Sequence, residues 1–262
     1  MQELSVILAD VQERIERAAK KVGRSPEEIE VIAVTKTHGA EVVQEAWDAG
    51  LRIVGENKVQ EAMWKKSLSV SGPEWHLIGH LQSNKVRHAL ETFDFIHSVD
   101  SLKLIDRIAA ISREAGFSPR ILLEVNVSGE KSKTGMDVAQ LPSAIEHVLE
   151  CGNIWLEGLM TMAPFSENPE DSRPYFRRLR ELRDEMEKRF GVKLPRLSMG
   201  MSGDYEVAVE EGATWLRLGT VLFGERPKIK AVKATGDEPA ESRQLGALDS
   251  YSGEGPTFKV LD

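Results

Sequence analysis

The side chain with the clearest chemical potential is Lys36, which closes an apolar, β-branched run over residues 31–36. The run predicts a buried strand, and Gly39 ends it before a helical pattern begins at Glu41. A lysine at the last residue of such a strand points into the C-terminal mouth of a sheet. Burial there favours the neutral amine, which is the form that attacks aldehydes. The alternative is a lysine that keeps its ammonium group in water.

Two glycine-containing segments later in the chain could hold a phosphate group. Residues 197–204 contain Ser202 and lead into a helical stretch, and residues 215–224 contain Gly219 and Thr220. Small-residue turns let backbone N–H groups approach a dianion closely, and the two hydroxyl groups add donors. A helix start at Ser202 would add a partial positive charge. Either segment alone resembles an ordinary helix cap, but the pair favours a phosphate site.

These segments belong to a repeating pattern in which eight apolar, β-rich runs alternate with helical stretches. The runs are residues 31–36, 52–55, 75–79, 93–99, 120–127, 154–162, 196–201 and 214–219. The helical stretches between them are residues 41–49, 56–66, 83–90, 101–115, 138–151, 169–190 and 203–211. Eight strands joined by helices predict an α/β fold, a single (β/α)8 TIM barrel. An open doubly wound sheet is the alternative.

A barrel would bring the candidate residues together. Ligand-binding residues of such barrels come from the C-terminal ends of the strands, and phosphates favour the loops after strands seven and eight. Both glycine-containing segments are predicted in those loops. Lys36, at the end of strand one, is their neighbour around a closed ring.

The composition indicates one globular domain in a reducing compartment. The chain has 262 residues and a single cysteine, Cys151, so an internal disulfide is excluded and a cytoplasmic location is expected. No apolar stretch is long enough to span a bilayer, and the N-terminus lacks a signal-peptide pattern. The formal net charge of −8 offers no general attraction for nucleic acid or an anionic membrane.

The two ends of the chain carry less chemistry. Apolar residues recur at steps of four and three from Leu4 to Val22 and predict an extra N-terminal helix that packs on the outside of the barrel. A self-associating coil is the alternative. We assign residues 1–226 to the barrel and residues 227–262, rich in charged and small residues, to the end of the last helix and a flexible tail.

Five blocks of this chain carry a resemblance to a known family. They are residues 33–38, 55–61, 75–85, 197–202 and 217–220. They resemble, in order and at plausible spacing, the signature blocks of the pyridoxal phosphate homeostasis protein family. Members of that family are barrel-only relatives of the N-terminal domain of alanine racemase. The resemblance covers roughly residues 1–226.

The resemblance implies a cofactor and its contacts. It implies pyridoxal 5′-phosphate (PLP) held as a Schiff base on Lys36. It also implies phosphate contacts from Ser202, Gly219 and Thr220, and it implies that Arg217 faces the pyridine nitrogen. Because a guanidinium group can only donate, a nitrogen facing it would stay unprotonated, and the ring would be a poor electron sink. A structural ion pair is the alternative role for Arg217.

Three further side chains are candidates for the pocket. Asn57 could bond the phenolate oxygen of the cofactor, or it could cap the next helix. We expect His80 to line the pocket and His76 to lie in the core, with no third ligand to complete a metal site. Met199 could pack on a flat ring, although plain core packing explains it equally well.

The loop of residues 128–136 follows strand five and should overhang the same mouth. Its two lysines, Lys131 and Lys133, could dock the cofactor transiently during entry or exit. A solvated loop without that role is the alternative.

We therefore expect a cytoplasmic, monomeric, non-catalytic carrier or buffer that binds PLP and passes it to PLP-dependent apoenzymes. A PLP-dependent amino-acid racemase is the first alternative. A barrel that binds another phosphorylated small molecule without forming an imine is the second.

Racemisation needs acid–base groups on both faces of the ring, and Lys36 could serve only one. In alanine racemase the second group is a tyrosine whose placement depends on an additional C-terminal domain. Only 36 residues follow Arg226 here. The three tyrosines, Tyr175, Tyr205 and Tyr251, fit the role poorly, and only Tyr205 is expected near the mouth.

Overall fold

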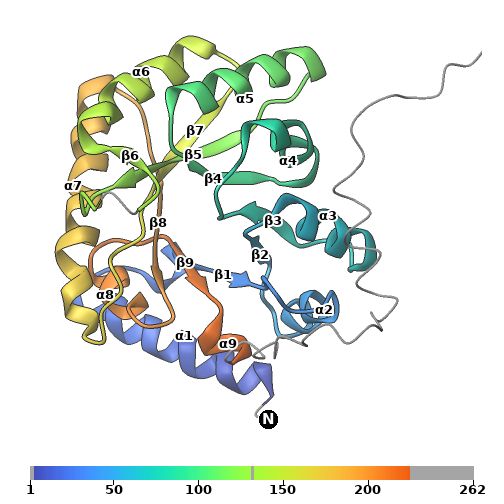
Figure 1. The fold of residues 1–262 in the computed structure, drawn as a ribbon. Coiled ribbons are helices and arrows are strands. Elements are labelled where there is room, and N and C mark those ends of the chain that lie inside the picture. Colours follow the sequence, from blue (N-terminus) through green and yellow to red (C-terminus); the bar gives the residue numbers. More distant parts are fainter. Residues whose placement is uncertain (1–2, 131–132, 225–262) are drawn as a thin grey trace, which may run out of the picture. The chain divides into compact units, whose positions relative to one another are not determined.

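Eight parallel strands close into a ring in the computed structural model, which describes residues 3–130 and 133–224 (Figure 1). The strands of the ring are β1 (Glu30–Val34), β2 (Ile53–Glu56), β3 (Glu74–Leu77), β4 (Phe95–Val99), β5 (Arg120–Asn126), β7 (Trp155–Met160), β8 (Arg196–Met201) and β9 (Trp215–Leu218). The order is β4-β3-β2-β1-β9-β8-β7-β5, and pairing between β4 and β5 closes it. The predicted TIM barrel is confirmed. A two-residue strand, β6 (Met136–Asp137), adds to β5 outside the ring.

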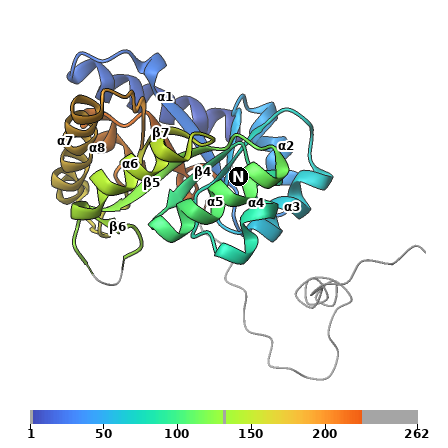
Figure 2. The same ribbon diagram turned by 90° about the horizontal axis from the view of Figure 1, so that it is seen from above.

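Helices surround the ring, as expected for parallel strands that are buried on both faces (Figure 1, Figure 2). They are α2 (Glu41–Asp48), α3 (Val59–Leu68), α4 (Val86–Thr92), α5 (Leu102–Ala115), α6 (Leu141–Cys151), α7 (Arg173–Phe190), α8 (Tyr205–Glu210) and α9 (Thr220–Phe223). Short 3-10 turns are Pro26–Glu28, Ser83–Lys85, Val138–Gln140 and Pro169–Ser172. Among the described helices, none is long and apolar enough to cross a membrane.

The barrel interior is filled at the end where the strands begin. A small buried cluster there consists of Ile32, Ile53, Phe95, Leu122, Met160 and Trp215. The rings of Phe95 and Trp215 meet edge to face at 4.8 Å. Two guanidinium groups from the starts of strands, those of Arg120 and Arg196, lie over these two rings. The interior is therefore a packed core at this end, and barrels of this kind bind their ligands at the opposite, C-terminal mouth.

The extra N-terminal helix, α1 (Leu4–Lys21), packs on the outside of the barrel, as predicted. Its buried stripe includes Leu8, Val11 and Ile15, and its principal helix contacts are α8 and α9. Arg14 adds a hydrogen bond of 3.0 Å from its Nε to Glu206 of α8. The helix thus fastens the last strands of the ring from outside.

The end of the first strand differs from the prediction. Strand β1 ends at Val34, so Lys36 lies two residues beyond the strand and not at its last position. The strand ends early because Thr37 adopts a positive φ of 67° and turns the chain. The predicted tail, residues 227–262, lies outside the described residues.

Removal of two buried methyl groups from α1 tests how much this helix contributes to the free energy of unfolding. Val11→Ala should lower the free energy of unfolding by about 2 kcal/mol, because Val11 is completely buried and its loss leaves a cavity. The matched control is Val6→Ala, the same change at an exposed position of the same helix, with an expected effect within about 0.5 kcal/mol. Urea denaturation measures both, and equal effects would show that α1 does not contribute to the core.

Candidate functional site

The predicted site residues gather on one sector of the ring. Lys36, Asn57 and His80 follow β1, β2 and β3, while Ser202 and Gly219 follow β8 and β9. The ring order β3-β2-β1-β9-β8 makes these five strands consecutive neighbours. Closure of the barrel therefore brings residues from the two ends of the described chain to one side of the mouth.

Lys36 is half-buried between two residues whose backbones are firmly held. Before it, the buried Thr35 donates its N–H to the carbonyl oxygen of Gly55 at 3.2 Å. After it, Thr37 donates its N–H to Oε1 of Glu61 at 2.6 Å. A positive φ is costly for a β-branched residue such as Thr37, and strain of this kind persists only where the surroundings impose it.

A buried ion pair supports this turn from below. Lys65 is completely buried, and its Nζ donates to the carbonyl oxygen of Thr35 at 2.7 Å, to Oε1 of Glu56 at 2.7 Å and to Oε1 of Glu61 at 2.9 Å. The hydroxyl of Thr35 also donates to Oε1 of Glu56. Burial raises the pKa of Glu56, while the charge of Lys65 opposes that rise. One cation thus ties α3 and β2 to the backbone on both sides of Lys36.

A row of hydrogen-bonded polar side chains, here called the polar chain, runs through the barrel interior. The guanidinium group of Arg217 lies almost fully buried on β9 and donates from its two NH₂ groups to the Ser198 hydroxyl at 2.8 Å and to the Thr161 carbonyl at 2.9 Å. From Ser198 the chain continues to Nδ1 of His97 at 2.9 Å. From Nε2 of His97 it passes to Nδ1 of His76, also at 2.9 Å. His76 is buried, as predicted, and its Nε2 meets Glu74 at 2.8 Å.

The donors of the polar chain can be assigned from its last member. The hydrogen bond with His76 lowers the pKa of Glu74, so Glu74 is a carboxylate that accepts from Nε2 of His76. In a neutral imidazole the other ring nitrogen accepts, so Ser198 donates to Nδ1 of His97 and itself accepts from Arg217. Burial lowers the pKa of both histidines, that of His97 well below its usual value, so each carries one proton at neutral pH. His97 then donates to His76, and His76 donates to Glu74. Burial also lowers the pKa of Arg217, to about 10, which leaves it protonated at neutral pH.

The two glycine-containing loops meet at the mouth. The Oγ of Ser202 accepts a hydrogen bond of 3.1 Å from the N–H of Val221, so the loop after β8 is joined to the start of α9. Gly200 turns the end of β8 with a φ of 89°, and a Cβ there would strike the side chain of Ala208. Gly219 is half-buried and the Thr220 hydroxyl group belongs to an exposed residue. The loop after β9 lies next to the end of β1, where Val34 is the nearest neighbour of Gly219.

Two predicted pocket residues lie further from the floor of the mouth. His80 is 54% exposed at its side chain, and its Nδ1 lies 3.3 Å from Oδ2 of Asp100. Asn57 is half-buried, and the loop after β3 rests on it so closely that a Cβ on Gly79 would overlap the backbone of Asn57. That close approach is the reason a glycine stands at position 79.

Met199 differs from the expectation. It is completely buried in the large hydrophobic cluster that includes the helices, because its neighbour Ser198 is the residue of β8 that faces the interior. The structure therefore does not bring Met199 to the mouth. It agrees with the alternative of plain core packing.

Of the two lysines in the loop after β5, Lys131 lies outside the described residues. Lys133 is half-buried, and the adjacent Thr134 donates from its hydroxyl to the buried Glu124 of β5 at 2.5 Å. Burial raises the pKa of Glu124. The described part of this loop is thus tied to the barrel interior.

The sequence patterns did not identify Lys65, His97 or Ser198. Lys65 follows Glu61 by four residues on one helix, a spacing that predicts only a surface ion pair. His97 and Ser198 lie 101 positions apart, and no local pattern relates them. The available signal was polar side chains at inward-facing positions of strands that otherwise read as apolar.

The chain is a closed parallel barrel with a lysine after its first strand and a buried arginine in its last strand. The family described as alanine racemase, N-terminal domain, matches residues 6–227. Alanine racemase of Clostridium difficile is 16% identical, has a TM-score of 0.67 and shares the fold. The match covers 88% of this chain and 59% of that one.

Closer relatives narrow the class. A pyridoxal phosphate homeostasis protein of Aquifex aeolicus is 46% identical over 220 residues, which cover 84% of this chain and 96% of the relative. The structure of PipY from Synechococcus elongatus with PLP bound is 40% identical, with a TM-score of 0.72, and covers 80% of this chain and 100% of that one. The chain belongs to the pyridoxal phosphate homeostasis protein family.

The buried lysine beneath the Lys36 turn should be essential for stability. Lys65→Met removes the charge that faces Glu56 and should cost about 3–5 kcal/mol of unfolding free energy at pH 8, because a carboxylate stays buried without a partner. The pKa of Glu56, already raised, would rise further. A folded carboxyl group with a raised pKa binds more protons than the unfolded chain does, so the stability of the variant should recover toward pH 5.5.

Urea denaturation at the two pH values measures this difference. Lys66→Met is the matched control, since Lys66 is the exposed neighbour on the same helix and donates to the Thr92 carbonyl at 2.6 Å. A Lys65→Met variant whose loss of stability is small, or independent of pH, would contradict the role given to the ion pair.

Proposed function

We propose that this chain binds PLP at the C-terminal mouth, holds it through a covalent imine with Lys36, and acts as a carrier or buffer of the cofactor inside the cell. The observation that supports this most directly is the adjacency of β1, β9 and β8. Across these strands lie an amine, a buried guanidinium group and two joined hydroxyl-bearing loops. A relative that is 40% identical over its whole length binds PLP.

The donor set fits the three polar ends of the cofactor. The Lys36 amine suits the aldehyde carbon, and the hydroxyl groups of Ser202 and Thr220 with the backbone at Gly219 suit a phosphate dianion. Arg217 suits the pyridine nitrogen, because it offers only donors and three of its five N–H groups remain beyond its bonds to Ser198 and Thr161. Asn57 and His80 would line the side of the mouth.

Bound PLP supplies an aldehyde and a ring that can accept electrons. The surroundings of Arg217 determine how well the ring could do so. Arg217 stays protonated at neutral pH, and its hydrogen-bond partners, the Ser198 hydroxyl and the Thr161 carbonyl, are neutral groups that leave its charge uncompensated. A ring nitrogen that faces this cation cannot carry its own proton, which weakens the ring as an electron sink. The residues thus favour holding the cofactor over catalysis with it.

Racemisation is the competing function, and the described tyrosines argue against it. Tyr205 is 2% exposed and packs under α1, with the guanidinium group of Arg14 lying 5.3 Å from its ring centre. The expectation that Tyr205 lies near the mouth is wrong, because α8 turns this side chain outward. Tyr175 packs on the outer hydrophobic cluster, and Tyr251 lies outside the described residues.

A carrier must also release its cargo. The mouth residues Thr37, His80 and Thr220 are exposed, so a PLP-dependent apoenzyme could approach the bound cofactor from solvent. We propose such apoenzymes as the partners and a monomer as the working form.

Replacement of the proposed covalent anchor tests the binding mode. Lys36→Ala should abolish the imine absorbance and weaken PLP binding at least about 100-fold, or about 2.7 kcal/mol, while the phosphate contacts keep weak binding. In the protein without substitutions, borohydride reduction followed by peptide mass mapping should locate the PLP adduct on Lys36. Lys133→Ala is the control and should keep the imine. An adduct on another lysine, or tight binding without any imine, would overturn the proposal and favour a different phosphorylated ligand.

Carrier and racemase differ in one measurable product. The PLP-loaded protein, incubated with L-alanine or L-serine in deuterated water, should form no D-enantiomer during repeated turnover, because the described tyrosines, Tyr175 and Tyr205, pack on the outer hydrophobic cluster and under α1 and supply no second acid–base group opposite Lys36. Chiral chromatography and mass spectrometry measure both enantiomers. Sustained formation of the D-enantiomer, lost in Lys36→Ala, would establish the racemase instead.

A further inference from the structure

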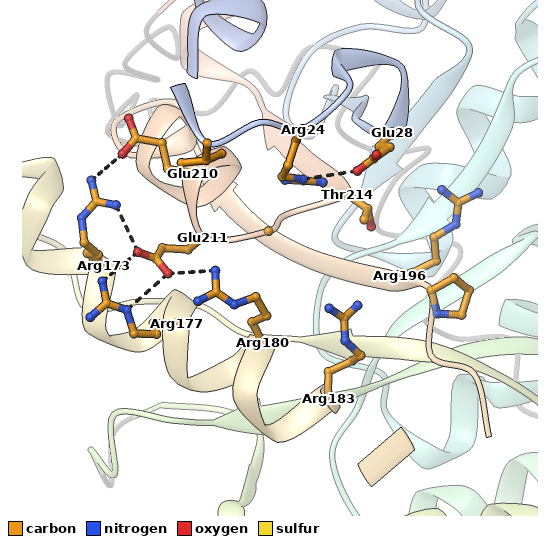
Figure 3. Close-up of a pocket in the computed structure, with 13 residues that line it drawn as sticks. Arg24, Glu28, Arg173, Arg177, Arg180, Arg183, Arg196, Glu210, Glu211 and Thr214 are labelled. Carbon is orange, nitrogen blue, oxygen red and sulfur yellow. Dashed lines mark hydrogen bonds and ion pairs between the residues drawn. The ribbon is translucent and has the colours of Figure 1, made fainter. Parts of the chain in front are cut away.

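A cavity of about 940 Å³ lies outside the barrel ring, between α7, the end of α8 and the segments that enter β1, β8 and β9 (Figure 3). Its polar wall is dominated by six arginines: Arg24, Arg173, Arg177, Arg180, Arg183 and Arg196. The proposed PLP site lies where these strands leave the barrel, so the cavity is separate from it. Nothing in the proposed function uses these side chains.

Four of the arginines come from one helix. Arg173, Arg177, Arg180 and Arg183 recur at steps of four, three and three along α7, which puts them on a common face. The apolar residues that fasten α7 to the barrel occupy the adjoining face. Figure 3 shows the guanidinium group of Arg180 turned toward Glu211, while Arg24 and Arg196 lie on the opposite wall.

The guanidinium groups of the wall are only partly used by their carboxylate partners. The wall itself holds three glutamates, Glu28, Glu210 and Glu211, and Glu30, Glu170 and Asp184 pair with the arginines from outside it. Glu211 is 5% exposed and pairs with three arginines at once, those at positions 173, 177 and 180, each at 3.1 Å. The bonds of these three arginines to Glu170, Glu210 and Glu211 use only some of their fifteen N–H groups, so donors remain for a ligand.

The other side of the cavity shows the effect of placing several arginines close together. Arg24 donates to the Val209 carbonyl at 2.7 Å and pairs with Glu28. Burial lowers the pKa of Arg24, and the charges of Arg183 and Arg180 push it in the same direction although Glu28 opposes them. Like charges are thus held within reach of one another across an open space, an arrangement that an anion between them would stabilise.

We propose that this cavity binds a small molecule carrying two or more linked phosphate groups. Guanidinium groups match phosphate oxygens in bidentate pairs, and several arginines on facing walls can engage more than one phosphate. The volume suits a small ligand. A long nucleic acid fits poorly, because the chain carries a net charge of −8 and Glu30, Glu170 and Asp184 flank the arginines.

Calorimetric titration of the full-length, PLP-loaded protein with sodium tripolyphosphate tests the proposal, and ATP forms a second arm. We expect saturable binding of tripolyphosphate. Equal affinity for ATP would assign recognition to the phosphates alone, and tighter binding of ATP would add a contribution from the nucleoside. Absence of binding of both probes would overturn the proposal.

Variants locate the site. Arg180→Gln with Arg183→Gln should weaken binding about 100-fold, about tenfold for each charge-assisted contact removed, and should leave the imine absorbance unchanged. Arg178→Gln is the matched control, because Arg178 is on the same helix, pairs with Glu181 and does not line the cavity. Equal losses in the control and the double variant would overturn the assignment.

A purely structural arginine network gives a different pattern. In that case the double variant would lower the melting temperature without any effect on ligand affinity, and the proposal would fail. Arg183→Gln alone covers the case in which the double variant does not fold, since Arg183 pairs with its sequence neighbour Asp184 at 2.6 Å and with no other carboxylate among the described residues. It should keep the fold and still bind tripolyphosphate about tenfold more weakly.

Discussion

The pairing of β1 with β9, which joins the first and last strands of the described chain, is the constraint on which the rest of this structure depends. Without it the eight strands would form an open sheet, with β1 at one edge and β9 at the other. Closure fixes the direction of every inward-facing side chain and gathers all C-terminal strand ends at one mouth. Lys36 and Ser202 are 166 positions apart in the chain, yet they follow β1 and β8, which flank the same strand, β9.

Closure also creates an interior in which charge must be compensated locally. The barrel does this in two ways. Lys65 is buried directly against Glu56 and Glu61, so opposite charges meet and hold the turn around Lys36. Arg217 has only neutral partners in direct contact, Ser198 and the Thr161 carbonyl, so its charge remains available at the floor of the mouth. The first arrangement gives rigidity, and the second preserves an electrostatic field for a ligand.

Much of this architecture could be predicted, because apolar β-branched runs and amphipathic stretches report burial locally. All eight strands of the ring lie within or overlap the predicted runs. The predictions fail where a single backbone angle or a contact with a distant residue determines where a strand ends or which way a side chain points. Thr37 ends β1 two residues early through its positive φ, and the exact facing of β8 determines that Ser198, not Met199, points inward. The contact of Tyr205 with α1 joins segments nearly 200 residues apart, which no local pattern records.

The hydrogen bonds from Arg217 through Ser198, His97 and His76 to Glu74 all point the same way. Such a row of dipoles ends, at its upper terminus, in a group that has no lone pair to receive a proton. Each bond in this row donates toward Glu74, so Nε2 of His76 already carries a proton and cannot take one from Glu74. In this arrangement the row does not carry protons from Glu74 to the floor of the mouth, and the two ends of the barrel are insulated from each other along it.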